Sequence, residues 1–462
     1  MTGGLTKTSR LALLAAMGMM GGAVSAQAAD LGGNCCADLE ERIAELEATT
    51  ARKGNRKVSL EVSGWVHQGV MWFDGAAHND SAVTKAKESN TYWGINRPEA
   101  NSRFRFVGKA KIDAKLSAGY LIEIQVNTSN SDNFTAANDD APGNTLAVRH
   151  SAWWIEHKDM GKVWLGQTSQ ATDGITEIQL SNTGHFANQN TTAGGLLRAV
   201  KITAGGNNLP LFNFMGGTST DTSQIGEGNR RNVIKYESPT IAGFILSAST
   251  GEDDIWDVAL RYAGEFSGFK LAFGIGYERT TEGPSAAAPV PPAADARSAG
   301  SERNCFISAG PSFDSSCEQF GASGSIMHVP TGLFVNGYYG WRRDDNSAAA
   351  VALADHTSTR WGVMGGIEQK FMPLGKTTIY GEYAQWSVGT NNTFTGALGV
   401  NGAAGSDMSM WGVGINQNIE AAAMDIYLQY RNYNGIETHT AAGVTTAYDN
   451  IQLIMGGGKI NF

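Results

Sequence analysis

Apolar and polar residues alternate with a period of two along much of the chain. Between residues 58 and 66, Val58, Leu60 and Val62 share one face, and the positions between them carry mostly polar side chains. Between residues 424 and 431, aliphatic and aromatic residues occupy the even positions, opposite Asp425 and Arg431. Charged residues on one face of such a segment indicate a half-solvated β-strand. A soluble β-sandwich would have the same pattern, so the arrangement of the strands must distinguish the two.

The alternating segments predict sixteen β-strands, most of them close to the length of about 10 residues that a tilted membrane-spanning strand requires. They are expected near residues 57–73, 102–115, 118–128, 147–157, 161–168, 231–238, 243–250, 255–265, 268–280, 317–329, 332–343, 358–371, 376–388, 407–419, 423–433 and 448–462. Aromatic residues cluster near the ends of several of these strands, as in the aromatic girdles of membrane barrels, among them Trp361, Tyr383, Trp386 and Trp411.

The connectors between these strands alternate in length. Even-numbered strands are followed by turns of two to four residues, such as 116–117 and 330–331. Odd-numbered strands are followed by long polar connectors, with 251–254 as the short exception. Long loops at one end and short turns at the other are the layout of an outer-membrane barrel. We therefore predict an all-β fold, a sixteen-stranded antiparallel transmembrane β-barrel over residues 57–462, with both termini at its periplasmic end.

The first 28 residues have the pattern of a secretory signal peptide. Lys7 and Arg10 precede an apolar run over residues 11–24, and cleavage is expected between Ala28 and Ala29. A buried N-terminal helix is the alternative. No later segment has 18 uninterrupted apolar residues, which argues against a helical membrane protein.

Residues 29–56 differ from the barrel pattern. Residues 38–50 are rich in Glu and Ala, and Leu39, Ile43 and Leu46 follow a heptad-like spacing that predicts a short helix. A basic linker over residues 52–57 leads into the first strand. On the periplasmic side, the helix is expected either to form a trimeric coiled coil or to be an amphipathic helix that lies on the barrel base or stays solvated.

Composition excludes two other classes of protein. The chain has 11 Trp, 13 Tyr and 18 Phe residues, too many aromatic residues for a disordered protein. Its net charge is −9, and loss of Lys7 and Arg10 with the signal peptide leaves 33 basic and 44 acidic residues, a net charge of −11. An acidic chain without a long basic tract is not expected to bind nucleic acid. The mean hydropathy of −0.23 fits both a soluble protein and a barrel with a wet lumen.

Several of these features together resemble a known family. The signal sequence, the segment DLEERIAELEATTARKGNRKVSLEVSGWV at residues 38–66, the strand layout and the terminal Lys-Ile-Asn-Phe resemble the general, or diffusion, porins of alphaproteobacteria. The resemblance implies a homotrimer in the bacterial outer membrane, with a water-filled channel for passive diffusion of ions and small hydrophilic solutes. A substrate-specific outer-membrane channel and a secreted soluble β-rich adhesin or hydrolase are the alternatives.

The resemblance also implies specific partners and a constriction. The terminal Phe462 would belong to the signal that the barrel-assembly machinery reads, and lipid and lipopolysaccharide would surround the barrel. The third external loop would fold inward and narrow the lumen. By position and size this loop corresponds to the connector 169–230, the longest in the chain.

Charged residues predict how such a constriction would act. Acidic residues on the connector would face basic residues on the wall, and the resulting field would filter solutes by charge. The candidate acids are Asp173, Glu177, Asp221 and Glu227. The candidate wall cations are Arg103, Arg105, Lys109, Lys111, Arg231, Lys235, Arg261, Arg342, Arg360 and Arg431. For any single arginine, a solvated position in a loop or at the rim is the alternative.

The remaining chemistry is sparse. Cys305 and Cys317 lie in the fifth external loop, in an oxidising compartment, and are candidates for a disulfide. The adjacent Cys35 and Cys36 are expected to be free or to link subunits, since vicinal cysteines rarely pair comfortably. The eight histidines have no metal-ligand spacing, and no nucleophile or nucleotide motif is present in the sequence. We therefore expect no enzymatic activity, no cofactor and no metal.

Overall fold

The structure is a computed structural model that describes most of the predicted barrel. The described residues are 58–74, 89–95, 101–129, 142–187, 201–204, 207–215, 225–251, 254–281, 315–346, 357–389, 403–440 and 443–462. The predicted signal peptide, its cleavage between Ala28 and Ala29, and the helix and linker of residues 29–56 lie outside them. So do Asp221, Cys305 and the pair Cys35 and Cys36. Within the described ranges, no helix combines the length and the apolar character needed to cross a membrane.

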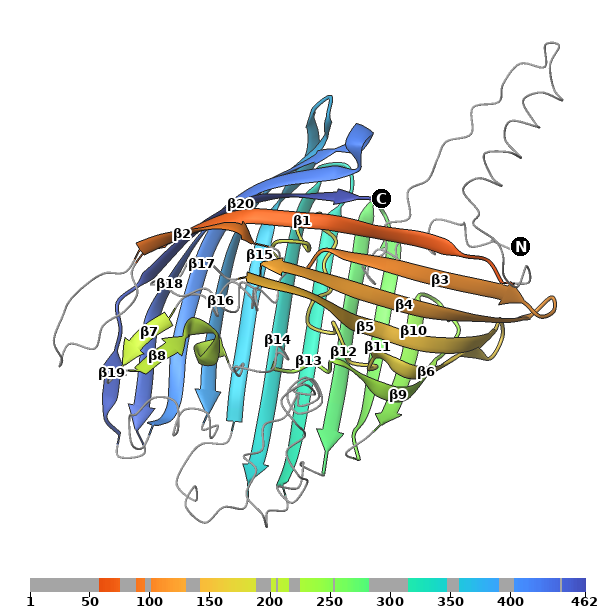
Figure 1. Cartoon of the computed structure of the whole chain (residues 1–462), viewed down its shortest axis with the longest axis horizontal. Helices are drawn as coiled ribbons and strands as arrows, with labels where there is room; N and C mark the ends of the chain where they lie inside the picture. The colour runs from red at the N-terminus through yellow and green to blue at the C-terminus, as the bar shows by residue number, and fades with distance from the viewer. Residues whose placement is uncertain are drawn as a thin grey trace.

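The described strands form a closed antiparallel barrel (Figure 1). Its sixteen strands are β1 (Glu61–Asp74), β3 (Arg103–Lys111), β4 (Leu116–Ser129), β5 (Pro142–His157), β6 (Gly161–Ser169), β9 (Arg230–Glu237), β10 (Phe244–Gly251), β11 (Trp256–Phe266), β12 (Phe269–Thr280), β13 (Ser315–His328), β14 (Leu333–Asn346), β15 (Thr357–Met372), β16 (Gly375–Gly389), β17 (Ala403–Ile419), β18 (Met424–Thr440) and β20 (Ile451–Asn461). Each pairs with the next, and β1 closes the barrel on β20 from Trp65–Asn461 to Asp74–Gln452. The predicted sixteen-stranded barrel is confirmed.

Some connectors contain strands that the alternation does not predict. β2 (Ser89–Ile95) pairs with β1 from Gly69 to Asp74, whereas β3 pairs with β1 only between Glu61 and Trp65. β2 thus pairs with the part of β1 that β3 does not reach, so the barrel has no open edge there. Likewise β19 (Thr445–Ala447) pairs with the far end of β18, which runs to Thr440 rather than to residue 433.

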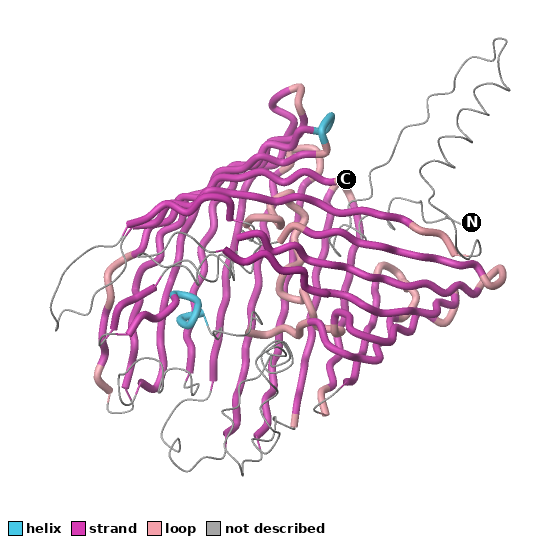
Figure 2. The backbone as a smooth tube through the Cα atoms, viewed as in Figure 1, coloured by secondary structure: helices cyan, strands magenta, loops and turns pink. Residues whose placement is uncertain are grey.

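The third connector has secondary structure of its own. β7 (Lys201–Ala204) and β8 (Asn207–Pro210) form a separate two-stranded hairpin, followed by the 3-10 helix η2 (Leu211–Met215). Figure 2 shows this helix in cyan, beside the short hairpin. The only other helical turn in the described residues is η5 (Glu420–Ala422), between β17 and β18.

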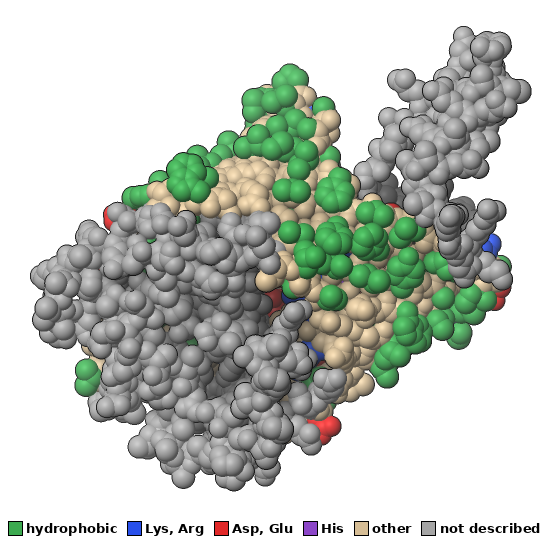
Figure 3. Space-filling view, viewed as in Figure 1, with side chains coloured by type: hydrophobic (Ala, Val, Ile, Leu, Met, Phe, Trp, Pro, Cys, Tyr) green, Lys and Arg blue, Asp and Glu red, His purple; other side chains and the backbone are tan. Residues whose placement is uncertain are grey.

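Alternate residues of the strands face opposite environments. Val335, Val363 and Val413 point outward and are 56, 49 and 50% exposed, whereas the inward-facing Asn336 and Arg360 are fully buried. Hydrophobic side chains gather over the outer surface of the described strands in Figure 3. An apolar outside and a polar inside is the reverse of a soluble fold and is typical of a barrel surrounded by lipid.

One part of the barrel interior is apolar instead. The helix η2 packs against β16 and β17. Its residues Leu211 and Phe214 are buried in one cluster with the inward-facing Trp386 and Met410. The ring of Phe214 also lies 5.9 Å from that of Tyr448 in an edge contact. The third connector therefore covers the inner face of these strands through apolar packing.

Candidate functional site

Residues 170–187 of the third connector follow the inner wall of the barrel. Near their start, the backbone N–H and the hydroxyl of Thr172 donate to Oδ2 of Asp257 on β11, at 2.6 and 2.8 Å. Further along, the backbone N–H of Ile178 donates to the hydroxyl of Ser323 on β13, at 3.1 Å. These contacts run from strand to strand around the inside of the barrel.

The same segment continues to the far side of the barrel. Asn182 donates through its backbone N–H to Glu368 on β15 and through its side chain to Asp425 on β18, both at 2.8 Å. The ring of Phe186 then stacks on that of Tyr427, with centroids 4.2 Å apart. Polar wall residues thus hold the segment from β11 to β18.

The end of this segment places His185 beside the buried His67 of the wall. The ring of His185 lies 5.9 Å from that of His67 on β1 and 5.7 Å from that of Tyr427. His67 Nε2 and the Tyr427 hydroxyl are hydrogen-bonded at 2.8 Å. Burial lowers the pKa of His185 well below its usual value, with the positive charge of Lys459 as a smaller cause. His185 is therefore neutral at pH 7 in this packing.

Residues 225–229 return along the wall beside the first segment. The backbone N–H of Gly226 donates to Oε1 of Gln319 at 3.0 Å. Gly226 has φ of +93°, and a Cβ on the facing Gly321 or Gly340 would collide with the backbone of residues 225 and 226. Glycine at these positions lets the connector lie directly on the strands.

Acidic residues of the connector have different surroundings. Oδ2 of Asp173 lies 3.8 Å from Nη1 of Arg230, an ion pair near the start of β9. Glu227 is buried and accepts from the hydroxyl of Thr176 at 2.7 Å. Burial, followed by the nearby charge of Glu177, raises the pKa of Glu227 to about 8. Glu227 is thus buried against Thr176 of the connector itself, whereas Asp173 faces a cation.

Two predicted wall arginines hold the connector in place. Arg261 Nη1 and Nη2 donate to the carbonyl oxygens of Ala171 and Asp173 at 2.7 and 2.9 Å. Arg360 Nη2 donates to the hydroxyl of Thr176 at 2.7 Å. Both guanidinium groups therefore bind the backbone or a hydroxyl of the connector.

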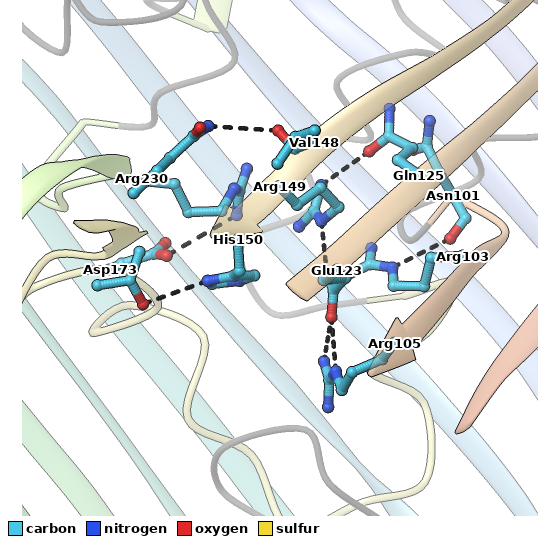
Figure 4. A network of polar contacts seen from close by, with 12 residues as sticks. Asn101, Arg103, Arg105, Glu123, Gln125, Val148, Arg149, His150, Asp173 and Arg230 are labelled. Atoms are coloured by element: carbon cyan, nitrogen blue, oxygen red, sulfur yellow. Dashed lines mark hydrogen bonds and ion pairs between the residues drawn. The ribbon is translucent and has the colours of Figure 1, made fainter. Parts of the chain in front are cut away.

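Opposite charges meet where arginines of β3, β5 and β9 lie close to Glu123 on β4 and Asp173 of the connector. Arg103 Nη1 and Arg149 Nε each lie 2.8 Å from Oε1 of Glu123, and Arg105 binds the other carboxylate oxygen. Glu123 is fully buried beneath them. Figure 4 shows these side chains together with Arg230 and Asp173. We define the arginine cluster as Arg103, Arg105, Arg149 and Arg230.

The position of Arg149 depends on a β-bulge. Glu123 pairs with His150 and Ile124 pairs with Val148, which leaves Arg149 without a register partner. The extra residue turns Arg149 to the inner face beside His150. The alternation of apolar and polar residues did not predict Arg149 or Glu123 as site residues. An arginine that faces lipid costs about 2–4 kcal/mol at the bilayer midplane. An arginine at a position that regular alternation would turn outward therefore indicates a bulge that turns it inward.

The remaining predicted cations lie elsewhere on the inner wall. Lys109 lies 3.6 Å from Glu156 and Lys111 is exposed, both closer to the periplasmic turns than the arginine cluster. Lys235 pairs with Glu237 at 3.0 Å, and Arg431 pairs with Glu382 at 2.8 Å. Arg231 and Arg342 are buried on β9 and β14. The predicted set is thus divided between the cluster, the connector contacts, the periplasmic end and other buried positions on β9, β14 and β18.

Cys317, at the start of β13, is disulfide-bonded. Its proposed partner Cys305 is not among the described residues, so the pairing of these two stays a prediction. No set of three or more metal-binding side chains comes together in the part of the chain that the structure describes.

Comparison with known proteins identifies the family. A family model described as Gram-negative porin matches residues 11–438, and the chain belongs to this family. It is therefore an outer-membrane channel through which solutes diffuse, with a β-barrel that spans the outer membrane.

Several solved structures are similar to the chain at low sequence identity. The anion-selective porin from Comamonas acidovorans is 13% identical with a TM-score of 0.50, covering 88% of this chain and 100% of its own. OmpT, an outer membrane protein of Vibrio cholerae, is 11% identical with a TM-score of 0.49, covering 89 and 100%. OprB of Pseudomonas putida is 12% identical with a TM-score of 0.48, covering 92 and 97%. No curated protein sequence matches the chain.

Proposed function

We propose that the barrel is a general diffusion channel for ions and small hydrophilic solutes, without enzymatic activity. The observation that carries this proposal is the course of residues 170–187, which follow the inner wall from β11 to β18. A connector held in this way narrows the passage but leaves it lined by polar and charged groups. Such a passage sorts solutes by size and charge.

The charges near the connector favour anions. The arginine cluster has four guanidinium groups, and its carboxylates are Glu123 and Asp173. The local charge is therefore positive, although the whole chain is acidic. Charges on the wall of a narrow pore lie within about one Debye length of a passing ion, about 8 Å at physiological salt. We infer a preference for anions at this point.

Conductance of the refolded protein in planar bilayers tests the proposal. Stepwise insertion of channels with current proportional to voltage is expected, with a reversal potential of anion-selective sign in a tenfold KCl gradient. Saturation by one solute, with exclusion of others of the same size, would favour a substrate-specific channel instead. Absence of any conductance from correctly folded protein would contradict the channel itself.

The assembly and processing of the chain remain proposals that rest on the family resemblance. We propose a homotrimer, a signal peptide ending at Ala28, and a mature N-terminal segment that lies on the periplasmic side. Phe462 is proposed as part of the assembly signal. Its backbone N–H donates to the carbonyl of Gly64 at 3.0 Å and its carbonyl accepts from Gly64 at 2.9 Å, so it closes the seam between the first and last strands.

A further inference from the structure

Two tryptophans face the inside of the barrel near its periplasmic end. Trp154 on β5 and Trp164 on β6 are register partners, with ring centroids 6.2 Å apart and planes inclined by 58°. Trp153, the neighbour of Trp154, points outward and is 47% exposed. An aromatic girdle toward lipid explains Trp153, but it does not explain the two indoles that face the interior.

Three lysines lie over these two indoles. Lys162 Nζ is 4.3 Å from the ring centroid of Trp154 and 4.1 Å from that of Trp164. Lys109 Nζ is 5.4 Å from Trp154, and Lys235 Nζ is 5.7 Å from Trp164. Ammonium groups within about 6 Å of an aromatic face are attracted to it. The indoles therefore hold three cations along one part of the wall.

The strand register aligns these groups. Lys109 pairs with Gly119, Gly119 with Trp154, Trp154 with Trp164, and Trp164 with Lys235, across five neighbouring strands. A Cβ on Gly119 would collide with the ring of Trp154, so the indole lies against the wall where a side chain is missing. We call Lys109, Trp154, Lys162, Trp164 and Lys235 the lysine–indole row.

Two carboxylates position the row without cancelling its charge. Trp164 Nε1 donates to Oε2 of Glu237 at 3.0 Å, and Lys235 Nζ lies 3.0 Å from Oε1 of the same carboxylate. Lys109 Nζ lies 3.6 Å from Glu156. Three ammonium groups thus face two carboxylates, and the row keeps a net positive charge beside aromatic surface.

We propose that the lysine–indole row is a binding site for small aromatic carboxylates on the periplasmic side of the constriction. Trp154 is only 4% exposed and supports the row from behind, so the ring of the solute would contact the partly exposed indole of Trp164, and its carboxylate would bind a lysine Nζ. Lys109 follows Arg105 by four residues on β3, about 13 Å at about 3.3 Å per residue, so the site lies beyond the arginine cluster. This inference rests on the proposed channel function and names a class of solute for it.

Aromatic carboxylates fit the row better than other small solutes. An aliphatic carboxylate would use only the lysines, and a neutral sugar would use only the indoles. A ring that also bears a carboxylate uses both, because contact between aromatic faces adds to charge pairing. Benzoate, acetate and glucose therefore separate the two contributions.

Current block in single channels of the full-length protein tests the proposal. Benzoate is expected to reduce the KCl current in a saturable manner, with an affinity at least about fivefold above that of acetate, since stacking on one aromatic side chain contributes about 1–3 kcal/mol. Trp164→Leu should lower benzoate affinity by about tenfold and leave acetate unchanged. Trp153→Leu, the outward neighbour, should have no effect. Lys162→Met should weaken both anions.

Several outcomes would overturn this inference while leaving the channel function intact. These are equal block by benzoate and acetate in the unmodified protein, equal block by benzoate and glucose, or an effect of Trp153→Leu as large as that of Trp164→Leu. Trp164→Phe, which keeps an aromatic ring, should retain most of the benzoate affinity even if Trp164→Leu folds poorly. Absence of any KCl conductance from the unmodified protein would instead contradict the proposed function.

Discussion

Arg149 donates through Nε to the buried carboxylate of Glu123 at 2.8 Å, from a bulged position that the regular strand pattern would turn toward lipid. The contact joins two neighbouring strands, β4 and β5, on their inner face. Arg103 and Arg105 on β3 bind the same carboxylate. One acid therefore positions three cations in the wall of the passage and offsets only one of their charges.

Replacing Glu123 with Gln should make the channel more selective for anions. The substitution keeps the shape of the side chain and removes its negative charge from the arginine cluster. The reversal potential in a tenfold KCl gradient should move toward the anion limit, and the barrel should unfold at a lower temperature because three guanidinium groups lose their partner. Glu265→Gln, at an exposed inward position on β11, makes the same change in charge away from the cluster. A shift no larger than that of Glu265→Gln would contradict this role.

Acid pH should loosen the end of the connector at His185. The groups around its ring are His67, Tyr427 and Phe186, with Lys459 at longer range. Packing lowers the pKa of His185 below its usual value of about 6.5. The packed end of the connector therefore keeps its full stability above about pH 6.5 and loses stability as the pH falls below that value. Current fluctuations should therefore increase between pH 7 and 5.

A matched pair of variants isolates this effect. His185→Phe keeps a ring in the packing and removes the titration, so it should flatten the pH dependence of the current fluctuations. His328→Phe, at an exposed turn between β13 and β14, should leave it as in the unmodified protein. Unchanged pH dependence in His185→Phe would show that this contact does not respond to protons in the working range.

Deleting Phe462 should lower the amount of protein inserted in the outer membrane. The deletion removes two backbone hydrogen bonds with Gly64 and an exposed aromatic ring at the end of β20. Interfacial aromatic rings favour the membrane boundary. Surface levels and heat-modifiable mobility on gels measure the effect, with Phe462→Tyr as the variant that keeps the ring. Normal levels after deletion would contradict the proposed role.

Much of the barrel could be predicted because its strands carry a local signal. Lipid on one side and water on the other impose alternation on each strand, and short turns fix where a strand reverses. Trp361, Tyr383 and Trp411 lie outward on the strands and are 38 to 43% exposed, as expected of aromatic residues near lipid. Such features depend on residues close in sequence, so they can be predicted without knowledge of the fold.

The missed features depend on contacts between distant residues. Trp386 was expected in an aromatic girdle, but it is fully buried inside the barrel in the cluster that contains η2. The period-two pattern could not show that a helix more than 150 residues earlier covers it. Arg149 was missed because one bulge reverses the face on which every preceding residue of β5 lies. Lys109 was grouped with Arg103 because the two share one face of a strand. Their partners differ, since Lys109 pairs with Glu156 on β5 and Arg103 pairs with Glu123 on β4.

The central claim is that connector acids and the arginine cluster together set the charge selectivity of the passage. The most direct test is the reversal potential across a tenfold KCl gradient for two double variants, Arg103→Ala with Arg105→Ala and Asp173→Asn with Glu177→Gln. The first should shift permeability toward cations and the second toward anions. Both shifts should shrink in 1 M salt, where the Debye length falls to about 3 Å. If neither double variant moves the reversal potential, the constriction lies elsewhere and the account is contradicted.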